Sequence, residues 1–280
     1  MNILFAIIFG IIEGITEWLP ISSTGHLIIF EHWMKFQNVS PEFWSMFEVV
    51  IQLGAILAVV VLYFKNLFPF KLEKDDDDDE KKKIKLDKPT LNLWGKILVA
   101  CIPAAIVGVL LDDWLEAKFY NAPTIATMLI LVGIVFIIVE SIKKKDFRVE
   151  EMEEITYKDA LIIGLFQLIA AIFPGTSRSG ATIIGALIIG ISRGIAAEFT
   201  FYLAVPVMVG ASLLKILKFG AIAGNELAIL IVGMLVAFVI SLLIIKFIMK
   251  YIKKHDFKVF GYYRILIGVI IFILIATHVI

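Results

Sequence analysis

Long apolar runs separated by short polar stretches make up most of the chain. Six runs approach the roughly 20 apolar residues that an α-helix needs to cross a bilayer. Two further apolar segments, residues 1–30 and 160–192, are each interrupted near the middle by a proline and a group of hydroxyl residues. The pattern predicts an all-α polytopic membrane protein with six transmembrane helices, expected at residues 49–64, 97–111, 124–139, 199–214, 227–245 and 265–280.

The composition excludes a water-soluble globular protein. Hydrophobic residues make up 60% of the 280 positions and the mean hydropathy is +0.94, whereas soluble domains are about 45–50% apolar. The one cysteine, Cys101, lies in an apolar run, which excludes a disulfide framework and a cluster of thiol metal ligands. We expect a single membrane domain over residues 1–280.

Basic residues are concentrated in three stretches between the apolar runs. Residues 65–96 hold nine of the 26 Lys and Arg residues, residues 141–158 hold five and residues 246–264 hold six. The positive-inside rule places these stretches in the cytoplasm. Segment 160–192 must then begin and end on the cytoplasmic side, and segment 1–30 on the external side. Both are predicted to be re-entrant helical hairpins of opposite orientation, because non-helical backbone at membrane depth persists only when it is buried in protein or lines a wet cavity.

Residues 74–83, within the first basic stretch, form a run of Lys, Asp and Glu. Such runs are typical of solvated, disordered segments. We therefore expect residues 65–96 to be a charged and disordered cytoplasmic loop. A regulatory or metal-binding acidic segment is the alternative.

An internal repeat appears when the chain is shifted on itself by 154 residues. Residues 10–23 then lie over residues 164–177, and a glycine, a Glu or Gln, a proline and a pair of hydroxyl residues coincide. Because the two segments enter from opposite sides, residues 1–122 and 155–280 are predicted to form an inverted-topology repeat. Such folds place their sites near the midplane, where broken helices of the two halves meet. The coinciding pairs are Gly10/Gly164, Glu13/Gln167, Pro20/Pro174, Ser22/Thr176 and Ser23/Ser177.

The first interrupted segment carries two carboxylates on an otherwise apolar helix. Glu13 and Glu17 are spaced i, i+4, which puts both on one helix face. Charged groups in a membrane helix need a partner or a polar cavity. After Pro20 the chain continues Ser22-Ser-Thr-Gly-His26, which supplies hydroxyl nucleophiles or donors, a turn and an imidazole.

The second interrupted segment contains a lone arginine. Arg178 is the only basic residue between Lys158 and Arg193, and it lies within Pro174–Thr182, a stretch rich in Gly and Ser. A glycine-rich turn before an apolar helix resembles an anion-binding nest at a helix N-terminus. The alternative, a structural salt bridge from the arginine to one of the carboxylates, is compatible with anion binding.

Together the two turns predict a site that handles phosphate. A carboxylate pair alone would indicate a cation or proton pathway, whereas the added arginine favours phosphoryl chemistry, in which fixed positive charge stabilises the equatorial oxygens. A divalent cation, Mg²⁺ or Ca²⁺, held by Glu13 and Glu17 would bridge diphosphate oxygens.

At these residues the chain resembles the bacterial undecaprenyl-diphosphatase family, also called the bacitracin-resistance family. The first family signature, Glu-x-x-x-Glu running into Pro-x-Ser-Ser-Thr-Gly-His, stands at residues 13–26. The second, Pro-Gly-x-Ser-Arg-Ser-Gly-x-Thr, stands at residues 174–182. Segments 47–54 and 198–206 also look like family segments, so the likeness covers nearly the whole chain. The clearest departure is a charged insert around residues 73–85.

The resemblance implies hydrolysis of undecaprenyl diphosphate to undecaprenyl phosphate and inorganic phosphate. This reaction recycles the lipid carrier for peptidoglycan synthesis and confers bacitracin resistance. The resemblance also implies a multi-pass protein of the bacterial cytoplasmic membrane, with a divalent-metal cofactor and an active site that faces the external side. Its expected partners are the polyprenyl diphosphate lipid substrate and membrane lipid, not nucleic acid; a homodimer is a further expectation.

The resemblance also assigns roles to the residues of the two turns. Glu13 and Glu17 are catalytic or metal-binding carboxylates, and Arg178 is catalytic. Ser23 is a candidate nucleophile or substrate contact, and His26 a candidate nucleophile or general base. Ser23, His26 and water stay open as the attacking group, with a slight preference for Ser23. The residues expected to bind the diphosphate are Ser22, Thr24, Gly175, Ser177, Arg178, Ser179 and Thr182.

A transporter is the competing function. Inverted repeats with broken helices are a transporter architecture, and the cargo would be an anion or the lipid phosphate itself. A scaffold protein is a more distant alternative, because it would have no use for Glu, Arg and His at the midplane.

Overall fold

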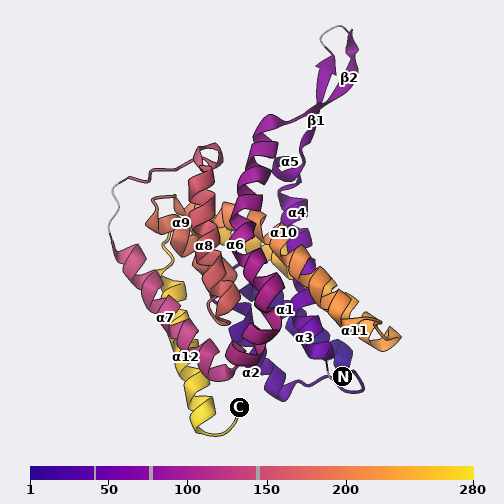
Figure 1. Ribbon diagram of the computed structural model, residues 1–280, viewed down its shortest axis with the longest axis vertical. Helices are drawn as coiled ribbons and strands as arrows, with labels where there is room; N and C mark the ends of the chain where they lie inside the picture. The colour runs from indigo at the N-terminus through magenta and orange to yellow at the C-terminus, as the bar shows by residue number, and fades with distance from the viewer. Residues whose placement is uncertain (41, 76–77, 143–145) are drawn as a thin grey trace.

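The computed structural model describes the backbone of residues 1–40, 42–75, 78–142 and 146–280, and their side chains outside residues 72–83 (Figure 1). Almost all of its regular structure is helical. The elements in chain order are α1 (Asn2–Thr16), α2 (Ser23–Trp33), α3 (Phe43–Val50), α4 (Gln52–Leu62), α5 (Phe64–Leu67), β1 (Phe70–Asp75), β2 (Asp78–Leu86), α6 (Lys88–Phe119), α7 (Ala122–Ser141), the 3₁₀ helix η1 (Met152–Glu154), α8 (Tyr157–Ile172), α9 (Arg178–Ile188), α10 (Arg193–Phe219), α11 (Gly224–Tyr251) and α12 (Lys258–Ala276).

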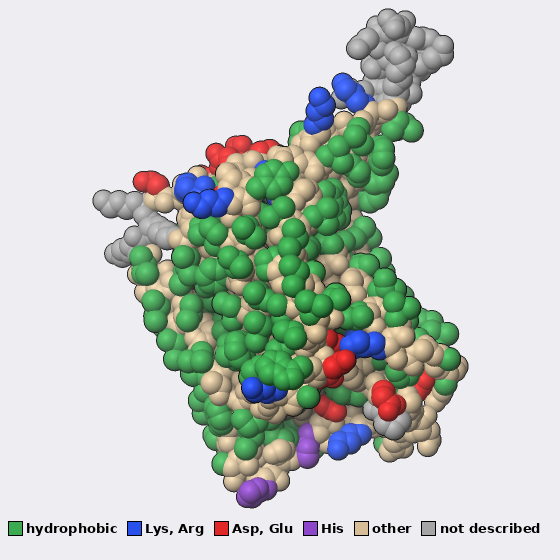
Figure 2. All heavy atoms as spheres, viewed as in Figure 1, with side chains coloured by type: hydrophobic (Ala, Val, Ile, Leu, Met, Phe, Trp, Pro, Cys, Tyr) green, Lys and Arg blue, Asp and Glu red, His purple; other side chains and the backbone are tan. Residues whose placement is uncertain are grey.

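Within the described residues, six helices are long and apolar enough to cross a membrane, as the sequence predicts. They are α3 joined with α4, α6, α7, α10, α11 and α12. On the face drawn in Figure 2, apolar side chains cover the middle of the molecule and charged side chains gather toward its ends. The protein is therefore a multi-pass membrane protein.

Several of these helices extend well beyond the apolar runs of the sequence. Helix α6 has 32 residues and begins at a cap, where the Asp87 side chain accepts from the Thr90 amide. At about 1.5 Å per residue it is about 48 Å long, more than the roughly 30 Å of hydrocarbon in a bilayer. The cap, and not the apolar run at residues 97–111, determines where this helix begins.

The two interrupted segments form two helix–turn–helix pairs. Helices α1 and α2 are joined by residues 17–22, and α8 and α9 by residues 173–177. Helix α1 packs against α11, and α8 packs against α6. Both contacts are close enough to require glycine: a Cβ on Gly10 would lie 2.6 Å from the Gly233 carbonyl oxygen, and one on Gly164 would lie 2.4 Å from that of Ala100.

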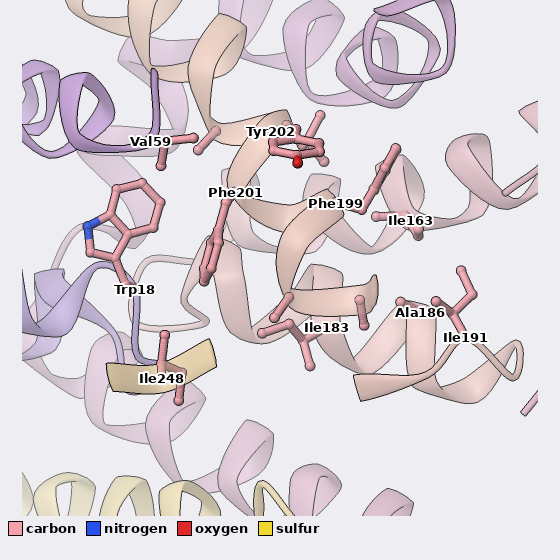
Figure 3. Close-up of a cluster of buried hydrophobic side chains, with 14 of the residues drawn as sticks. Trp18, Val59, Ile163, Ile183, Ala186, Ile191, Phe199, Phe201, Tyr202 and Ile248 are labelled. Carbon is pink, nitrogen blue, oxygen red and sulfur yellow. The ribbon is translucent and has the colours of Figure 1, made fainter. Parts of the chain in front are cut away.

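A buried aromatic cluster holds the first turn against the long helices. Trp18, directly after Glu17 in the chain, is fully buried. Its ring lies edge-on to Phe201 of α10, with 5.2 Å between the ring centroids (Figure 3). Val59 of α4 lies near both rings in the same cluster (Figure 3). The turn is therefore held by packing against α4 and α10 as well as by its polar contacts.

Parts of all three basic stretches meet at one end of the molecule. The Lys96 ammonium donates to the Glu153 carbonyl oxygen at 3.0 Å, which joins the first stretch to the second. Glu140, near the end of α7, accepts from the Phe257 amide at 3.0 Å and pairs with Arg193, which joins the third. The β1–β2 hairpin extends from this same end (Figure 1). Residues 143–145 of the second stretch lie outside the described residues.

Two sequence-based expectations differ from the structure. Residues 65–96 are predicted as a disordered loop, yet they contain α5, the antiparallel pair β1–β2 and the first turns of α6. Residues 76–77 of the charge run lie outside the described residues. The second difference is Arg264, counted above as part of a basic cytoplasmic stretch: it lies within α12 and is fully buried.

Candidate active site

The two turns meet through one ion pair. Nη2 of Arg178, the first residue of α9, lies 2.8 Å from Oε1 of Glu17, and both side chains are largely buried. The Ser179 hydroxyl donates to the Glu17 carbonyl oxygen at 3.1 Å. Carboxylate and arginine, predicted from segments 161 residues apart, therefore lie in direct contact.

Glu17 also binds the first hydroxyl of α2. Its second carboxylate oxygen, Oε2, accepts from the Ser23 hydroxyl at 3.0 Å. One carboxylate thus holds the arginine on one oxygen and a serine on the other. A hydroxyl that already donates to a carboxylate is placed to lose its proton to it when it attacks.

Glu13 is buried without a partner. Its side chain is fully buried, and neither carboxylate oxygen has a hydrogen-bond partner among the described residues. An unpaired buried carboxylate is strongly unfavourable unless it is protonated or binds a cation. Glu13 therefore fits one ligand of a divalent cation, next to Glu17. The described residues contain no group of three or more His, Cys, Asp or Glu that could hold a metal, so further ligands would come from substrate and water, as is usual for Mg²⁺.

The helices that follow the two turns begin in the same way. Ser22, before α2, has φ +73°, and Ser177, before α9, has φ +68°. The hydroxyl of each accepts from an amide three residues on, that of Gly25 at 3.3 Å and that of Gly180 at 3.2 Å. Serine rarely adopts this left-handed backbone conformation. Its presence at both caps therefore indicates that the two turns are built alike.

The two caps align the turns in a register that differs by one residue from that of the sequence match. A shift of 154 residues pairs Ser23 with Ser177, whereas the caps pair Ser22 with Ser177, a shift of 155. Gly175, which has φ +88°, is the extra residue in the second turn. A Cβ at this position would lie 2.6 Å from the Ile125 carbonyl oxygen, so only glycine fits between the turn and α7.

His26 is held at both ring nitrogens. Nδ1 lies 2.7 Å from the Ser22 carbonyl oxygen and Nε2 lies 2.9 Å from the Tyr263 hydroxyl. The side chain lies on the first turn of α2 and is buried. The structure thus places His26 beside the Ser22 cap, and Tyr263 of α12 is a contact that no sequence motif indicates.

Hydroxyl groups of the second turn mostly bind protein atoms. Thr182 donates to the Arg178 carbonyl oxygen at 2.9 Å and lies 2.9 Å from the Thr200 hydroxyl. The Arg178 guanidinium donates to the Thr200 carbonyl oxygen, also at 2.9 Å. Ser177 and Ser179 hydroxyls are 3.1 Å apart. These contacts fix the direction of the guanidinium toward the first turn.

Arg264 is a residue of the candidate site that no sequence motif indicates. It is fully buried, and its guanidinium donates to the carbonyl oxygens of Pro20 at 3.1 Å, Gly175 at 2.9 Å and Thr176 at 2.9 Å. One side chain thus binds both turns. Its position directly before an apolar run is the only signal in the sequence, and that position also suits a loop residue.

The structure brings most of the predicted residues together, although not all are in direct contact. The ion pair and its hydroxyl partner form the centre, and the two caps flank it. Thr24 lies half-buried in the first turn of α2. The residues joined by hydrogen bonds are Glu17, Ser23, Arg178 and Ser179 in one group, Ser22 with His26 in a second, and Thr182 with Arg178.

Comparison with known proteins gives matches over the whole chain. The model of the bacitracin resistance protein BacA family matches residues 6–270. The undecaprenyl-diphosphatase of Desulfitobacterium hafniense is 55% identical over 282 residues, which cover 100% of this chain and 98% of that protein. That of Lachnoclostridium phytofermentans is 58% identical over 273 residues, with 97% and 96% covered. Undecaprenyl-diphosphatase 1 of Clostridium acetobutylicum is 54% identical over 280 residues, with 99% of each covered.

Proposed function

The chain belongs to the bacitracin resistance protein BacA family, and we propose that its two turns form the centre with which it hydrolyses undecaprenyl diphosphate to undecaprenyl phosphate and inorganic phosphate. The protein is a membrane-bound phosphatase whose product is the lipid carrier of cell-wall synthesis. The observation that carries the assignment of the centre is the Glu17 carboxylate, which contacts the Ser23 hydroxyl and the Arg178 guanidinium at once.

In the proposed reaction Ser23 is the nucleophile. Its oxygen attacks the terminal phosphorus, its proton passes to Glu17, and the bond from that phosphorus to the bridging oxygen breaks. The bridging oxygen leaves with undecaprenyl phosphate. Water then attacks the phosphorus of the phosphoserine, and the bond from phosphorus to the serine oxygen breaks. The water oxygen leaves with the inorganic phosphate, and the serine oxygen takes back its proton from Glu17. Covalent catalysis of this kind divides one difficult step into two easier ones.

Arg178 stabilises the charge of the transferred group. Without substrate its guanidinium binds Glu17, and the diphosphate would compete for it. This exchange would release Glu17 to accept the serine proton and would place a fixed positive charge beside the phosphoryl oxygens. Amides and hydroxyls of the two turns and their caps would bind the remaining oxygens of the diphosphate or position the groups that do so. The residues concerned are Ser22, Thr24, Gly175, Ser177, Ser179 and Thr182.

A divalent cation, Mg²⁺ or Ca²⁺, is the proposed cofactor. The buried and unpartnered Glu13 supports this proposal, and Glu17 would be the second protein ligand. When bound, the cation would neutralise charge on the diphosphate. Without the cation, Glu13 would hold a proton, because a buried carboxylate without a partner is unfavourable; cation binding would displace that proton.

The proposed topology is an inverted repeat with two re-entrant hairpins that begin from opposite faces. It is supported by the matched caps at Ser22 and Ser177 and by the matched close approaches at Gly10 and Gly164. With the basic stretches in the cytoplasm, the α1–α2 hairpin would begin on the external face, and the site would open to that side. A homodimer is also proposed, and size analysis of the protein in detergent would test it.

Phosphate release from a long-chain prenyl diphosphate by purified protein tests the proposal. We expect release by the wild type, loss of it with a chelator, and its absence in Arg178→Ala and Ser23→Ala. Ser141→Ala is the matched control, because among the described residues its exposed hydroxyl bonds only to the Ile137 carbonyl oxygen of its own helix. Substantial release by Ser23→Ala would identify His26 or water as the attacking group. Absence of release by the wild type, with lipid or anion flux in sealed vesicles, would favour a transporter.

A further inference from the structure

Tyr263, outside both turns and every sequence motif, contacts the centre through His26. Its hydroxyl lies 2.9 Å from Nε2 of the imidazole, and the two rings are stacked, with centroids 5.6 Å apart and 6° between their planes. Tyr263 is 38% exposed, whereas His26 is 7% exposed. The phenol therefore occupies the one ring nitrogen of His26 that does not contact Ser22.

The two contacts of His26 determine which nitrogen carries the proton. Nδ1 lies 2.7 Å from the Ser22 carbonyl oxygen. A carbonyl oxygen only accepts hydrogen bonds, so Nδ1 must carry the hydrogen. In the neutral ring Nε2 then has the free lone pair, and it accepts the O–H of Tyr263.

We propose that Tyr263 is a positioning residue of the hydrolytic centre and acts through His26. Its hydroxyl keeps the imidazole in the Nδ1-protonated form, and in the orientation in which Nδ1 donates to the Ser22 carbonyl oxygen. It also engages the lone pair with which His26 would otherwise attack phosphorus, so the attack is left to Ser23. This inference rests on the proposed function.

Comparison of the two turns shows why this contact belongs to the chemistry and not to the cap alone. Ser177 adopts φ +68° and caps α9 just as Ser22 caps α2, yet Ala181 stands where His26 stands in the first turn. The second cap therefore forms without an imidazole or a phenol. Only the turn that presents the nucleophile has them, and there they fix the residue directly before Ser23.

Tyr263→Phe is the primary test, with phosphate release as the measurement. Loss of one hydrogen bond to a positioned group is expected to lower kcat roughly tenfold with KM within about twofold. Tyr262→Phe is the matched control, because Tyr262 is one residue earlier, is 60% exposed, and has no hydrogen bond with another described residue. If Tyr263→Phe behaves like Tyr262→Phe, the inference is wrong.

A double-mutant cycle distinguishes action through His26 from a separate effect. His26→Asn keeps an amide where Nδ1 lies but has no atom that reaches Tyr263. We expect Tyr263→Phe to have no further effect on kcat in this background, since residues that act as a unit are not additive. An equal loss in both backgrounds would overturn the inference.

A measurement independent of turnover covers the case in which His26→Asn is inactive. In protein labelled with ¹⁵N-histidine, we expect His26 to be protonated on Nδ1. Its Nε2 signal should move toward that of a bare nitrogen in Tyr263→Phe and stay unchanged in Tyr262→Phe. A ring protonated on Nε2 would overturn the inference whatever the activity. Failure of the wild type to release phosphate would instead contradict the proposed function.

Discussion

At the scale of single residues, Arg264 joins the two turns from outside both of them. Its guanidinium donates to three backbone carbonyls, that of Pro20 in the first turn and those of Gly175 and Thr176 in the second. Buried carbonyls left without donors are unfavourable by about 1–3 kcal/mol each. We therefore expect Arg264→Met to lower the thermal unfolding midpoint in detergent and to abolish phosphate release.

Arg148→Met is the control for this substitution. Arg148 pairs with Asp159 at 2.6 Å, and 49% of the arginine side chain is exposed. Without the arginine, the Asp159 carboxylate still accepts from the Thr156 amide and hydroxyl. The change should lower the unfolding midpoint only slightly. Arg264→Lys should recover little stability, because one ammonium cannot reach carbonyls on both turns at once. Equal midpoints for Arg264→Met and Arg148→Met would contradict the role of the buried guanidinium.

The burial of Glu13 without a partner leads us to expect that this residue lowers the stability of the protein while it is needed for activity. Because neither carboxylate oxygen has a partner among the described residues, Glu13→Gln removes a carboxyl group that must take up a proton to be buried without a cation, which is unfavourable at neutral pH. We expect the unfolding midpoint to rise in the presence of a chelator, while phosphate release falls at least a hundredfold. Raising the concentration of Mg²⁺ or Ca²⁺ should stabilise the wild type and not the variant. An unfolding midpoint below that of the wild type in chelator would show that Glu13 has a partner.

The residues of the two motifs could be predicted, whereas their distant partners could not. Glu13, Glu17 and Arg178 are conspicuous because charged groups are rare in apolar helices. Tyr263 and Arg264 stand at the edge of a basic stretch, where a polar residue is ordinary. Their contacts join positions 88 to 244 residues apart, and such contacts depend on how the helices pack, which the local pattern does not contain.

At the scale of elements, close helix packing makes a prediction for α8. A Cβ on Gly164 would lie 2.4 Å from the Ala100 carbonyl oxygen of α6, which is backbone and cannot rotate away. Gly164→Ala should therefore separate α8 from α6, with a loss of about 1–3 kcal/mol in unfolding free energy. The shift would also move Arg178 relative to Glu17 and lower activity.

Gly108→Ala in α6 is the matched control, because a Cβ there meets nothing within 4 Å. It should raise stability slightly, since alanine favours a helix over glycine by about 1 kcal/mol. The measurement is the unfolding midpoint of both variants in the same detergent. If Gly164→Ala were as stable as Gly108→Ala, the close contact between α6 and α8 would be wrong.

Element positions were more predictable than element ends and registers. All six long apolar helices were found, because the apolar runs determine them. The extra length of α6 comes from a polar cap at Asp87, outside the run. The one-residue change in register between the two turns comes from Gly175, whose positive φ adds a residue without changing the cap that follows. A match by letters places both hydroxyl pairs together and so misses this insertion.

At the scale of the whole molecule, the positions of the basic stretches in the sequence and the contacts in the structure both distinguish one end of the molecule from the other. Contacts of Lys96 with Glu153, and of Glu140 with Arg193 and Phe257, gather the three basic stretches at one end. The sequence predicted their common side from charge alone. The distribution of charge along the sequence does not predict where along the helices the two turns meet. That position depends on the lengths of α1 and α8 and on the contact between Glu17 and Arg178.

Orientation in the membrane follows from this arrangement and can be tested in intact cells. In a Cys101→Ser background, Lys35→Cys and Lys254→Cys each place one thiol at an exposed position. Lys35 lies between α2 and α3, on the expected external side, and Lys254 lies between α11 and α12, within a basic stretch. A membrane-impermeant maleimide should label Lys35→Cys in intact cells and Lys254→Cys only after the membrane is permeabilised. Labelling of Lys254→Cys alone in intact cells would show that the protein has the opposite orientation. The α1–α2 turn with Ser23 would then be reached from the cytoplasm. Phosphate release by both variants confirms that the labelled proteins are folded, so the labelling pattern decides from which side the substrate diphosphate reaches the serine.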